Sequence, residues 1–272
     1  MSGQVRAMVL AGNGINCEIE TAHAARSAGA DQVDVVYLWD LATGAANLAA
    51  YQLLCLPGGF LDGDDLGSAR ASTIRIHRTA VDGERLFDQI RRFADDGGLM
   101  ISICNGFQLM VKLGLLPALG GELGVQQVTL TWNDSGRFED RWVHLRADPE
   151  SPCVFTRGLD RIELPVRHGE GKIVFADDAV RGGLFAERQV PLCYVDPETG
   201  EPTMDYPLNP NGSPNAVASL TDPTGRLFGL MPHPEAFLHR TNHPRWTRRD
   251  LPEEGQGLAL FRNAVDFIRQ GN

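Results

Sequence analysis

Cys104 occupies a position where a thiol could act as a nucleophile. The apolar run 98–103 predicts a strand that ends at this cysteine, and residues 107–113 predict a helix just after it. The small residue Gly106 suits a sharp turn between them. Such a turn projects the thiol, while the helix N-terminus favours the thiolate and offers N–H groups to an oxyanion. A cysteine at a strand end is more often a buried hydrophobic residue, so this segment alone is ambiguous.

A second segment could supply a general base and its partner. Residues 226–231 predict a short buried strand that leads into His233 and Glu235, each preceded by a proline. His233 could deprotonate Cys104, and Glu235 could fix the tautomer and orientation of the imidazole. A histidine near a strand end is usually structural. A histidine and glutamate held by prolines, in a chain with a cysteine turn, favour catalysis.

A pair of glycines follows a third apolar run. Residues 53–56 predict a buried strand, and Gly58 and Gly59 come shortly after it. Adjacent glycines let the backbone approach a ligand closely and present N–H groups to it. For an isolated pair, an ordinary turn would be the better interpretation.

These three elements resemble, in order and spacing, the class I (triad) glutamine amidotransferases. A closer resemblance is to the glutaminase components of phosphoribosylformylglycinamidine synthases, and it covers nearly the whole chain. Its later blocks look more like the glutaminase domain of single-chain synthases than like the shortest free-standing subunits. The chain departs from many members at Ala236 and Phe237, where an arginine is common. The blocks that carry the closer resemblance are 59–67, 104–108, 136–139, 168–172, 206–215 and 231–235.

The resemblance implies hydrolysis of glutamine through a covalent intermediate. Cys104 would attack the side-chain amide and form a γ-glutamyl thioester, with His233 moving protons and Glu235 orienting it. Backbone N–H groups of Gly59 (or Gly58) and Asn105 are expected to hold the oxyanion. By resemblance, the residues that bind the substrate would be Gln108, Arg137 and Phe138.

The expected cofactors and partners follow from the same chemistry. No metal or organic cofactor is expected on this chain, because the oxyanion site polarises the carbonyl. Nothing in the sequence resembles an ATP-binding synthetase, and ammonia released into the cytosol would be protonated and lost. The resemblance therefore implies a large ATP-dependent synthetase partner, which would use ATP and Mg to form formylglycinamidine ribonucleotide, often with a small bridging subunit.

Composition limits the other possible partners. The 272 residues carry a formal net charge of −10, which argues against general binding to nucleic acid or to an anionic membrane. The sequence has neither an apolar run long enough for a membrane span nor a signal-peptide core. Five scattered cysteines without zinc-site spacing suit a reducing compartment, so a cytoplasmic location is expected.

The apolar pattern predicts an α/β fold. Alternating strands and helices imply a three-layer, mainly parallel sheet with helices on both faces. Ligands bind at the carboxyl ends of such strands, which would bring the glycine pair and Cys104 to one rim. The expected strands are 7–10, 33–38, 53–56 and 99–103, and the expected helices are 18–28, 83–95 and the one after Cys104.

The second half of the chain has a different hydrophobic pattern. Residues 125–230 contain short alternating runs, which we expect to extend the sheet and to form antiparallel hairpins. Residues 255–268 predict a closing helix. With no repeat and no linker evident, residues 1–272 are expected to form a single glutamine amidotransferase domain.

Some patterns have competing interpretations. Gly12 and Gly14 lack the third glycine of a dinucleotide fingerprint, because Cys17 stands there. The aspartates in 62–65 fit a solvated turn better than a cation site. The family resemblance instead implies that this loop forms a wall near the glutamine pocket. The basic cluster 239–249 is either a solvated loop or a docking surface for an acidic partner.

Three alternative functions stay open. The first is an amidotransferase that serves a different synthetase, although the block 206–215 argues against it. The second is a stand-alone cysteine hydrolase, in which the histidine commonly follows the cysteine more closely. The third is a non-catalytic subunit, which would be expected to have lost Cys104, His233 or Glu235.

Overall fold

A six-stranded sheet forms the centre of the computed structural model, which describes residues 3–271. The strand order is β12-β13-β6-β3-β1-β2, and every neighbouring pair is parallel except β12 with β13. The predicted α/β fold with a mainly parallel sheet is confirmed. The strands are β1 Arg6–Ala11, β2 Gln32–Tyr37, β3 Leu53–Leu56, β6 Leu99–Ile103, β12 Ser219–Thr221 and β13 Leu227–Leu230.

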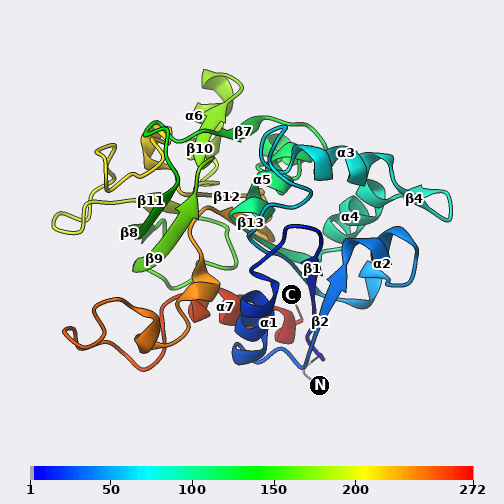
Figure 1. Ribbon diagram of the computed structural model, residues 1–272, viewed down its shortest axis with the longest axis horizontal. Coiled ribbons are helices and arrows are strands. Elements are labelled where there is room, and N and C mark those ends of the chain that lie inside the picture. Colours follow the sequence, from blue (N-terminus) through cyan, green and yellow to red (C-terminus); the bar gives the residue numbers. More distant parts are fainter. Residues whose placement is uncertain (1–2, 272) are drawn as a thin grey trace.

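Helices cover both faces of this sheet (Figure 1). On one face α1 packs against α7, and on the other α3 contacts both α4 and α5. Leu10 of β1 and Leu54 of β3 share an apolar space with residues from α2 to α5, which places these helices on the same face. The helices are α1 Glu18–Ser27, α2 Leu38–Ala42, α3 Arg70–Arg78, α4 Leu86–Asp95, α5 Asn105–Lys112 and α7 Leu258–Arg269.

The central strands β3 and β6 have the bounds that the sequence predicts. Every residue of both strands is buried, because a parallel strand covered on two faces needs an unbroken apolar run. The prediction for α4 was too long at its start. Two short strands, β4 Ala80–Val81 and β5 Glu84–Arg85, pair as a hairpin, so the helix begins only at Leu86.

The expectation that strands of the second half extend the sheet holds only for β12 and β13. The others form two separate antiparallel sheets, β11-β8-β9 and β10-β7. Their alternating pattern correctly predicted strands with one buried face, but it does not specify which sheet a strand joins. These elements are β7 Val128–Thr131, β8 Glu139–Ala147, β9 Arg161–His168, β10 Lys172–Phe175, α6 Asp178–Ala186 and β11 Leu192–Tyr194.

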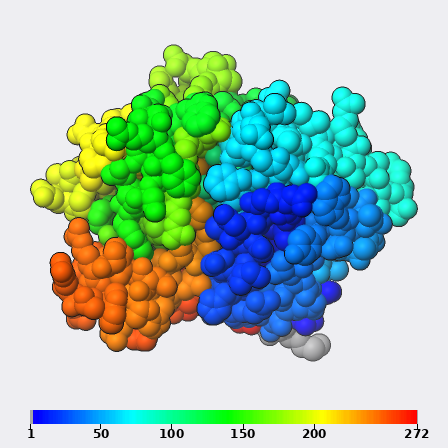
Figure 2. All heavy atoms as spheres, in the orientation of Figure 1, coloured from blue at the N-terminus to red at the C-terminus, as the bar shows by residue number. Residues whose placement is uncertain are grey.

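Segments far apart in the sequence meet on one face of the molecule. The short helix η4, Pro234–Ala236, contacts both α1 and β9. Figure 2 shows the same meeting of the blue amino-terminal, green central and orange carboxy-terminal segments. Among residues 3–271, no helix combines the length and the apolar character needed to cross a membrane.

Candidate active site

Cys104 stands at a strained turn between β6 and α5. Its backbone has φ 50° and ψ −104°, an unusual conformation for a residue other than glycine. The Cys104 N–H donates to the Leu230 carbonyl at 2.8 Å, and the Gln108 N–H donates to the Cys104 carbonyl at 3.0 Å. A Cβ at Gly106 would lie 2.0 Å from the Leu56 carbonyl oxygen. The turn therefore requires glycine at that position, and it has the geometry of a nucleophile elbow.

His233 and Glu235 form a buried pair just beyond β13. His233 Nδ1 lies 2.6 Å from Glu235 Oε1, and the two residues are only 2% and 4% exposed. The His233 N–H donates to the Pro165 carbonyl of β9 at 2.8 Å, which fixes the loop. Burial opposes protonation of the imidazole, but the Glu235 carboxylate and the Cys104 thiol outweigh it, so the pKa of His233 is raised well above its ordinary value.

The imidazole and the thiol meet across Gly58. A Cβ at Gly58 would lie 3.5 Å from Cys104 Cβ, an ordinary contact, but only 2.7 Å from His233 Cε1, so a side chain there would clash with the imidazole. Cys104 Sγ points to the Arg167 carbonyl oxygen at 3.6 Å, and His233 Nε2 has no hydrogen-bond partner within the described residues.

The glycine pair lies on the same rim as Cys104, as predicted. Strands β3 and β6 run parallel with Leu56 opposite Ser102, which brings their carboxyl ends together. Gly59 has φ 145°, and a Cβ there would lie 2.6 Å from the Gly14 carbonyl oxygen. The segment after β1 therefore holds the glycine turn closely, with the Phe60 N–H donating to Gly14 at 2.8 Å.

A cavity of about 490 Å³ opens beside the cysteine, a size typical of small-molecule sites. Its lining includes two neighbouring carboxylates, Asp64 and Glu170, which form an acidic wall, and the arginines Arg137 and Arg167. Carboxylates and guanidinium groups in one cavity suit the opposite charges of a free α-amino acid. Of the residues proposed from the sequence, those that line the cavity are Gly59, Cys104, Gln108, Arg137, Phe138, His233 and Glu235.

Gly58 and Asn105 lie buried behind this lining. The Asn105 side chain accepts from the Leu61 N–H at 2.9 Å and donates to Gln108 Oε1 at 3.0 Å. Gln108 Nε2 in turn donates to the Glu170 carbonyl oxygen at 2.6 Å. Because both ends of the Gln108 amide are engaged, its geometry suits holding the cavity wall together.

Asn133 fixes the loop that carries Arg137 and Phe138. Its amide donates to the carbonyl oxygens of Arg137 at 3.0 Å and of His168 at 2.8 Å. The block 206–215 contributes through Asn211, whose carbonyl oxygen accepts from the Asp134 N–H at 3.2 Å. Through Asn133, the blocks 136–139 and 168–172 of the family resemblance are thus joined in space.

Sequence reasoning missed several residues of the cavity. Glu170 was not assigned a role, although it lies in a block of the family resemblance. The resemblance makes the loop with Asp64 a wall near the glutamine pocket, and Asp64 does line the cavity. Burial, followed by the charge of Glu170, raises the pKa of Asp64. Asp62 instead pairs with Arg75 at 2.9 Å, so the three nearby aspartates do not act as one group. Cys17 also lines the cavity, and no signal in its local sequence indicates this.

The basic cluster is partly neutralised within the chain. Arg249 pairs with Glu163 at 2.7 Å, and Arg240 pairs with Glu253 at 3.4 Å. His243 is buried and lies 3.2 Å from Glu163. The segment therefore has fewer unpaired charges than the sequence suggests. Its docking role stays a prediction.

A glutamine-like chloroketone is expected to label Cys104 selectively. Burial raises the pKa of Cys17, and it raises the pKa of Cys55 to about 12 and those of Cys153 and Cys193 to about 11. These four thiols remain protonated at neutral pH and react slowly. Peptide mapping by mass spectrometry after brief treatment would test this. Label found mainly on one of the other four would contradict the site.

His168 is expected to make the protein less stable in acid. Burial, followed by the charge of His233, lowers its pKa to about 3, while the unfolded chain titrates near 6.5. The unfolded state therefore binds the extra proton first, and stability falls by about 1.4 kcal/mol per pH unit as pH decreases from 6.5 towards 3.

The substitution His168→Asn removes the titrating imidazole. It puts an amide in the place of His168 Nδ1, which lies 3.1 Å from Asn133 Oδ1. Its unfolding free energy, measured by denaturant titration, should fall less steeply between pH 6 and pH 4 than that of the unaltered protein. The exposed His23→Asn is the control and should keep the original slope. Equal slopes for His168→Asn and the unaltered protein would contradict this assignment.

Known proteins resemble the chain over its whole length. A model described as the CobB/CobQ-like glutamine amidotransferase domain matches residues 4–268. The chain is 42% identical over 269 residues to phosphoribosylformylglycinamidine synthase subunit PurQ of Dehalococcoides mccartyi, covering 98% of this chain and 99% of that protein. It is 37% identical to part of phosphoribosylformylglycinamidine synthase of Drosophila melanogaster, covering 100% of this chain and 20% of that protein.

A solved structure agrees with these matches. The structure of PurLQS from Thermotoga maritima contains a chain with a TM-score of 0.71 and 27% identity, covering 97% of this chain and 99% of that one. The present chain therefore belongs to the CobB/CobQ-like glutamine amidotransferase domain family, in the branch that contains the PurQ subunits of phosphoribosylformylglycinamidine synthase.

Proposed function

We propose that this chain is the glutaminase subunit of phosphoribosylformylglycinamidine synthase. It hydrolyses glutamine to glutamate and ammonia, and it supplies the ammonia to an ATP-dependent synthetase that forms formylglycinamidine ribonucleotide. The observation that carries this proposal is the position of Cys104, at a strained elbow beside the buried His233–Glu235 pair, in a chain closely similar to PurQ subunits.

The reaction begins when His233 Nε2 accepts the thiol proton of Cys104 and the thiolate attacks the amide carbon of glutamine. The oxyanion is held by backbone N–H groups, which we assign to Gly59 and Asn105. His233 then gives its proton to the leaving ammonia, and a γ-glutamyl thioester remains. Water activated by His233 releases glutamate. Glu235 keeps the Nδ1 proton in place throughout.

The charged residues of the cavity orient the substrate in this proposal. The α-carboxylate of glutamine lies towards Arg137, and Phe138 covers this end of the molecule. The α-ammonium group lies towards Asp64 and Glu170. A bound ammonium group would favour the charged form of Asp64 and so offset the effect of burial on its pKa.

The ammonia acceptor belongs to another chain. The similar structure described as PurLQS supports a synthetase partner, and we assign ATP and Mg to it, with no cofactor on the present chain. A small bridging subunit completes the assembly in this proposal. Five free thiols, including the nucleophile, suit a reducing cytoplasm.

Reconstitution with the synthetase tests this function. Purified chain and synthetase should form formylglycinamidine ribonucleotide from glutamine, ATP and the formamide ribonucleotide, with one glutamate released per amidine. Glutamine hydrolysis by the isolated chain is expected to be slower than in the complex, because the Gly59 turn can complete its oxyanion site on docking.

The same assay run with a synthetase of another pathway is the control for specificity. If glutamine hydrolysis were coupled only to that other synthetase, the proposed partner would be wrong and the other synthetase would take its place. Full hydrolysis by the isolated chain, unchanged by any synthetase, would indicate a stand-alone hydrolase.

A further inference from the structure

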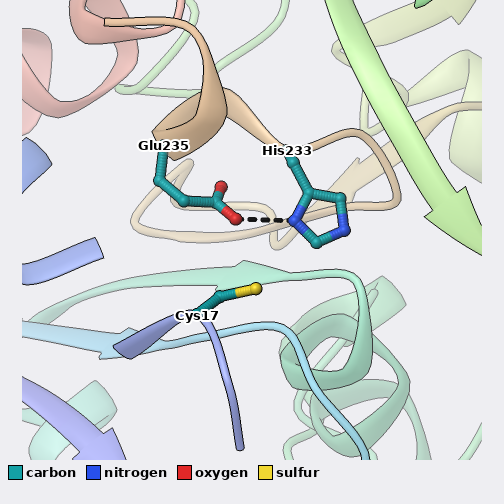
Figure 3. Close-up of side chains that lie close together, drawn as sticks. All are labelled: Cys17, His233 and Glu235. Carbon is teal, nitrogen blue, oxygen red and sulfur yellow. Dashed lines mark hydrogen bonds and ion pairs between the residues drawn. The ribbon is translucent and has the colours of Figure 1, made fainter. Parts of the chain in front are cut away.

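Cys17 lies beside the His233–Glu235 pair, although it is far from both in sequence. It follows β1 and immediately precedes α1, and η4 packs against that helix. A sulfur, an imidazole nitrogen and a carboxylate oxygen from Cys17, His233 and Glu235 all lie within 4.8 Å of one another. Figure 3 shows the Cys17 thiol pointing towards the pair.

The two oxygens of the Glu235 carboxylate differ in their hydrogen bonding. Glu235 Oε1 is engaged by His233 Nδ1, whereas Glu235 Oε2 is buried and has no hydrogen-bond partner within the described residues. A buried carboxylate oxygen without a partner is costly and can be satisfied by a cation. Cys17 and Glu235 both line the open cavity, so an ion from solvent can reach them.

We propose that a thiophilic divalent cation, with Zn²⁺ as its representative, binds Cys17 Sγ, His233 Nδ1 and the Glu235 carboxylate and reversibly inhibits the chain. Thiolate, imidazole and carboxylate are the ligand types that zinc prefers. In a tetrahedral zinc site the ligand atoms lie roughly 3.5 Å apart. The contact of 2.6 Å between His233 Nδ1 and Glu235 Oε1 must therefore open by about 1 Å. The Cys17 sulfur, which lies within 4.8 Å of the other two ligand atoms, needs an inward movement of similar size at most. A water molecule from the cavity takes the fourth position.

Inhibition follows from the tautomer that the metal imposes. The ion replaces the Nδ1 proton that His233 shares with Glu235, and it displaces the thiol proton of Cys17. Starting from the imidazolium form, binding releases these two protons and leaves the remaining proton on Nε2. A histidine with a metal on Nδ1 and a proton on Nε2 cannot accept the proton of Cys104. The ion is thus an inhibitor and not a cofactor.

Cobalt spectroscopy tests the binding site without reference to activity. Co²⁺ added to the intact chain should give a thiolate-to-cobalt charge-transfer band that saturates at one ion per chain. Cys17→Ser should abolish the band, whereas Cys104→Ser should keep it, because Cys104 is not a ligand. Cys193→Ser is the matched control, since Cys193 is also half-buried but belongs to β11. A band that survives Cys17→Ser, or no band at all, would overturn the proposal.

Zinc inhibition tests the consequence, and this part rests on the proposed glutaminase function. Glutamine hydrolysis would be measured for each variant with and without Zn²⁺, so that each serves as its own reference. Cys17→Ser should raise the half-inhibitory zinc concentration at least about tenfold, whereas Cys193→Ser should not change it. Mg²⁺ should not inhibit, because it disfavours thiolate ligands.

A second variant, a chelator and the cobalt spectra separate the existence of the metal site from its effect on activity. Cys17→Ala, checked for folding by circular dichroism, should behave as Cys17→Ser does. A chelator should restore activity to the zinc-treated protein. If the chain hydrolysed no glutamine, the cobalt spectra would still decide whether the metal site exists. Equal zinc sensitivity of Cys17→Ser and the unaltered protein would refute the inhibitory role.

Discussion

Cys104→Ala is expected to lower glutamine-dependent amidine formation by at least about 10⁴-fold, because it removes the thiol that forms the thioester. Ammonium salt should still support amidine formation in the reconstituted complex, since the synthetase is unaltered. The fold should persist, because alanine fits the space of the buried thiol. Both activities would be measured in one assay, with glutamine or ammonium as the nitrogen source.

The control for this experiment is Cys193→Ala, which removes a thiol remote from the cavity. It should retain activity with both nitrogen sources. Cys104→Ala with unchanged glutamine hydrolysis would mean that Cys104 is not the nucleophile. Loss of the ammonium-dependent reaction as well would instead indicate that the complex no longer assembles.

Glu235→Gln should lower kcat for glutamine hydrolysis by about 10²- to 10⁴-fold. The Gln amide can donate to His233 Nδ1, which moves the imidazole proton to Nε2 and removes the acceptor that Cys104 needs. Loss of the carboxylate should also lower the pKa of His233, because its charge favours the imidazolium. The measurement is the pH dependence of kcat and kcat/KM for the variant and the unaltered protein.

A second histidine–carboxylate pair provides a matched control. His239 Nε2 lies 2.6 Å from Glu253 Oε1 at the surface, where the carboxylate is 73% exposed. Glu253→Gln makes the same chemical change outside the cavity and should leave kcat unaltered. A Glu235→Gln variant with normal kcat would show that the buried carboxylate does not orient His233.

Local sequence was sufficient for the elements that bear the nucleophile and the base. The apolar run 99–103, the cysteine and Gly106 specify a strand, a turn and a helix, because each preference acts over a few residues. The same holds for the strand before His233. Parallel strand order then accounts for the shared rim, since βαβ connections place carboxyl ends together. The α/β fold and the approach of Cys104 to His233 could therefore be predicted.

Other contacts between distant segments could not be predicted in this way. The acidic wall joins Glu170 to Ser68, 102 positions apart, through bonds of 3.2 and 2.9 Å. The short strands after residue 125 were recognised as strands, but their pairing into separate sheets depends on long-range packing.

The sequence by itself determined the fold class, the family and the residues proposed for the chemistry, because these depend on local patterns and on motifs in order. Only the tertiary structure decided the surroundings of those residues. It placed Glu170 in the cavity, engaged both ends of the Gln108 amide, and brought Cys17 to the His233–Glu235 pair. The physical reason is that a side chain's neighbours are set by the packing of whole elements, which no short segment encodes.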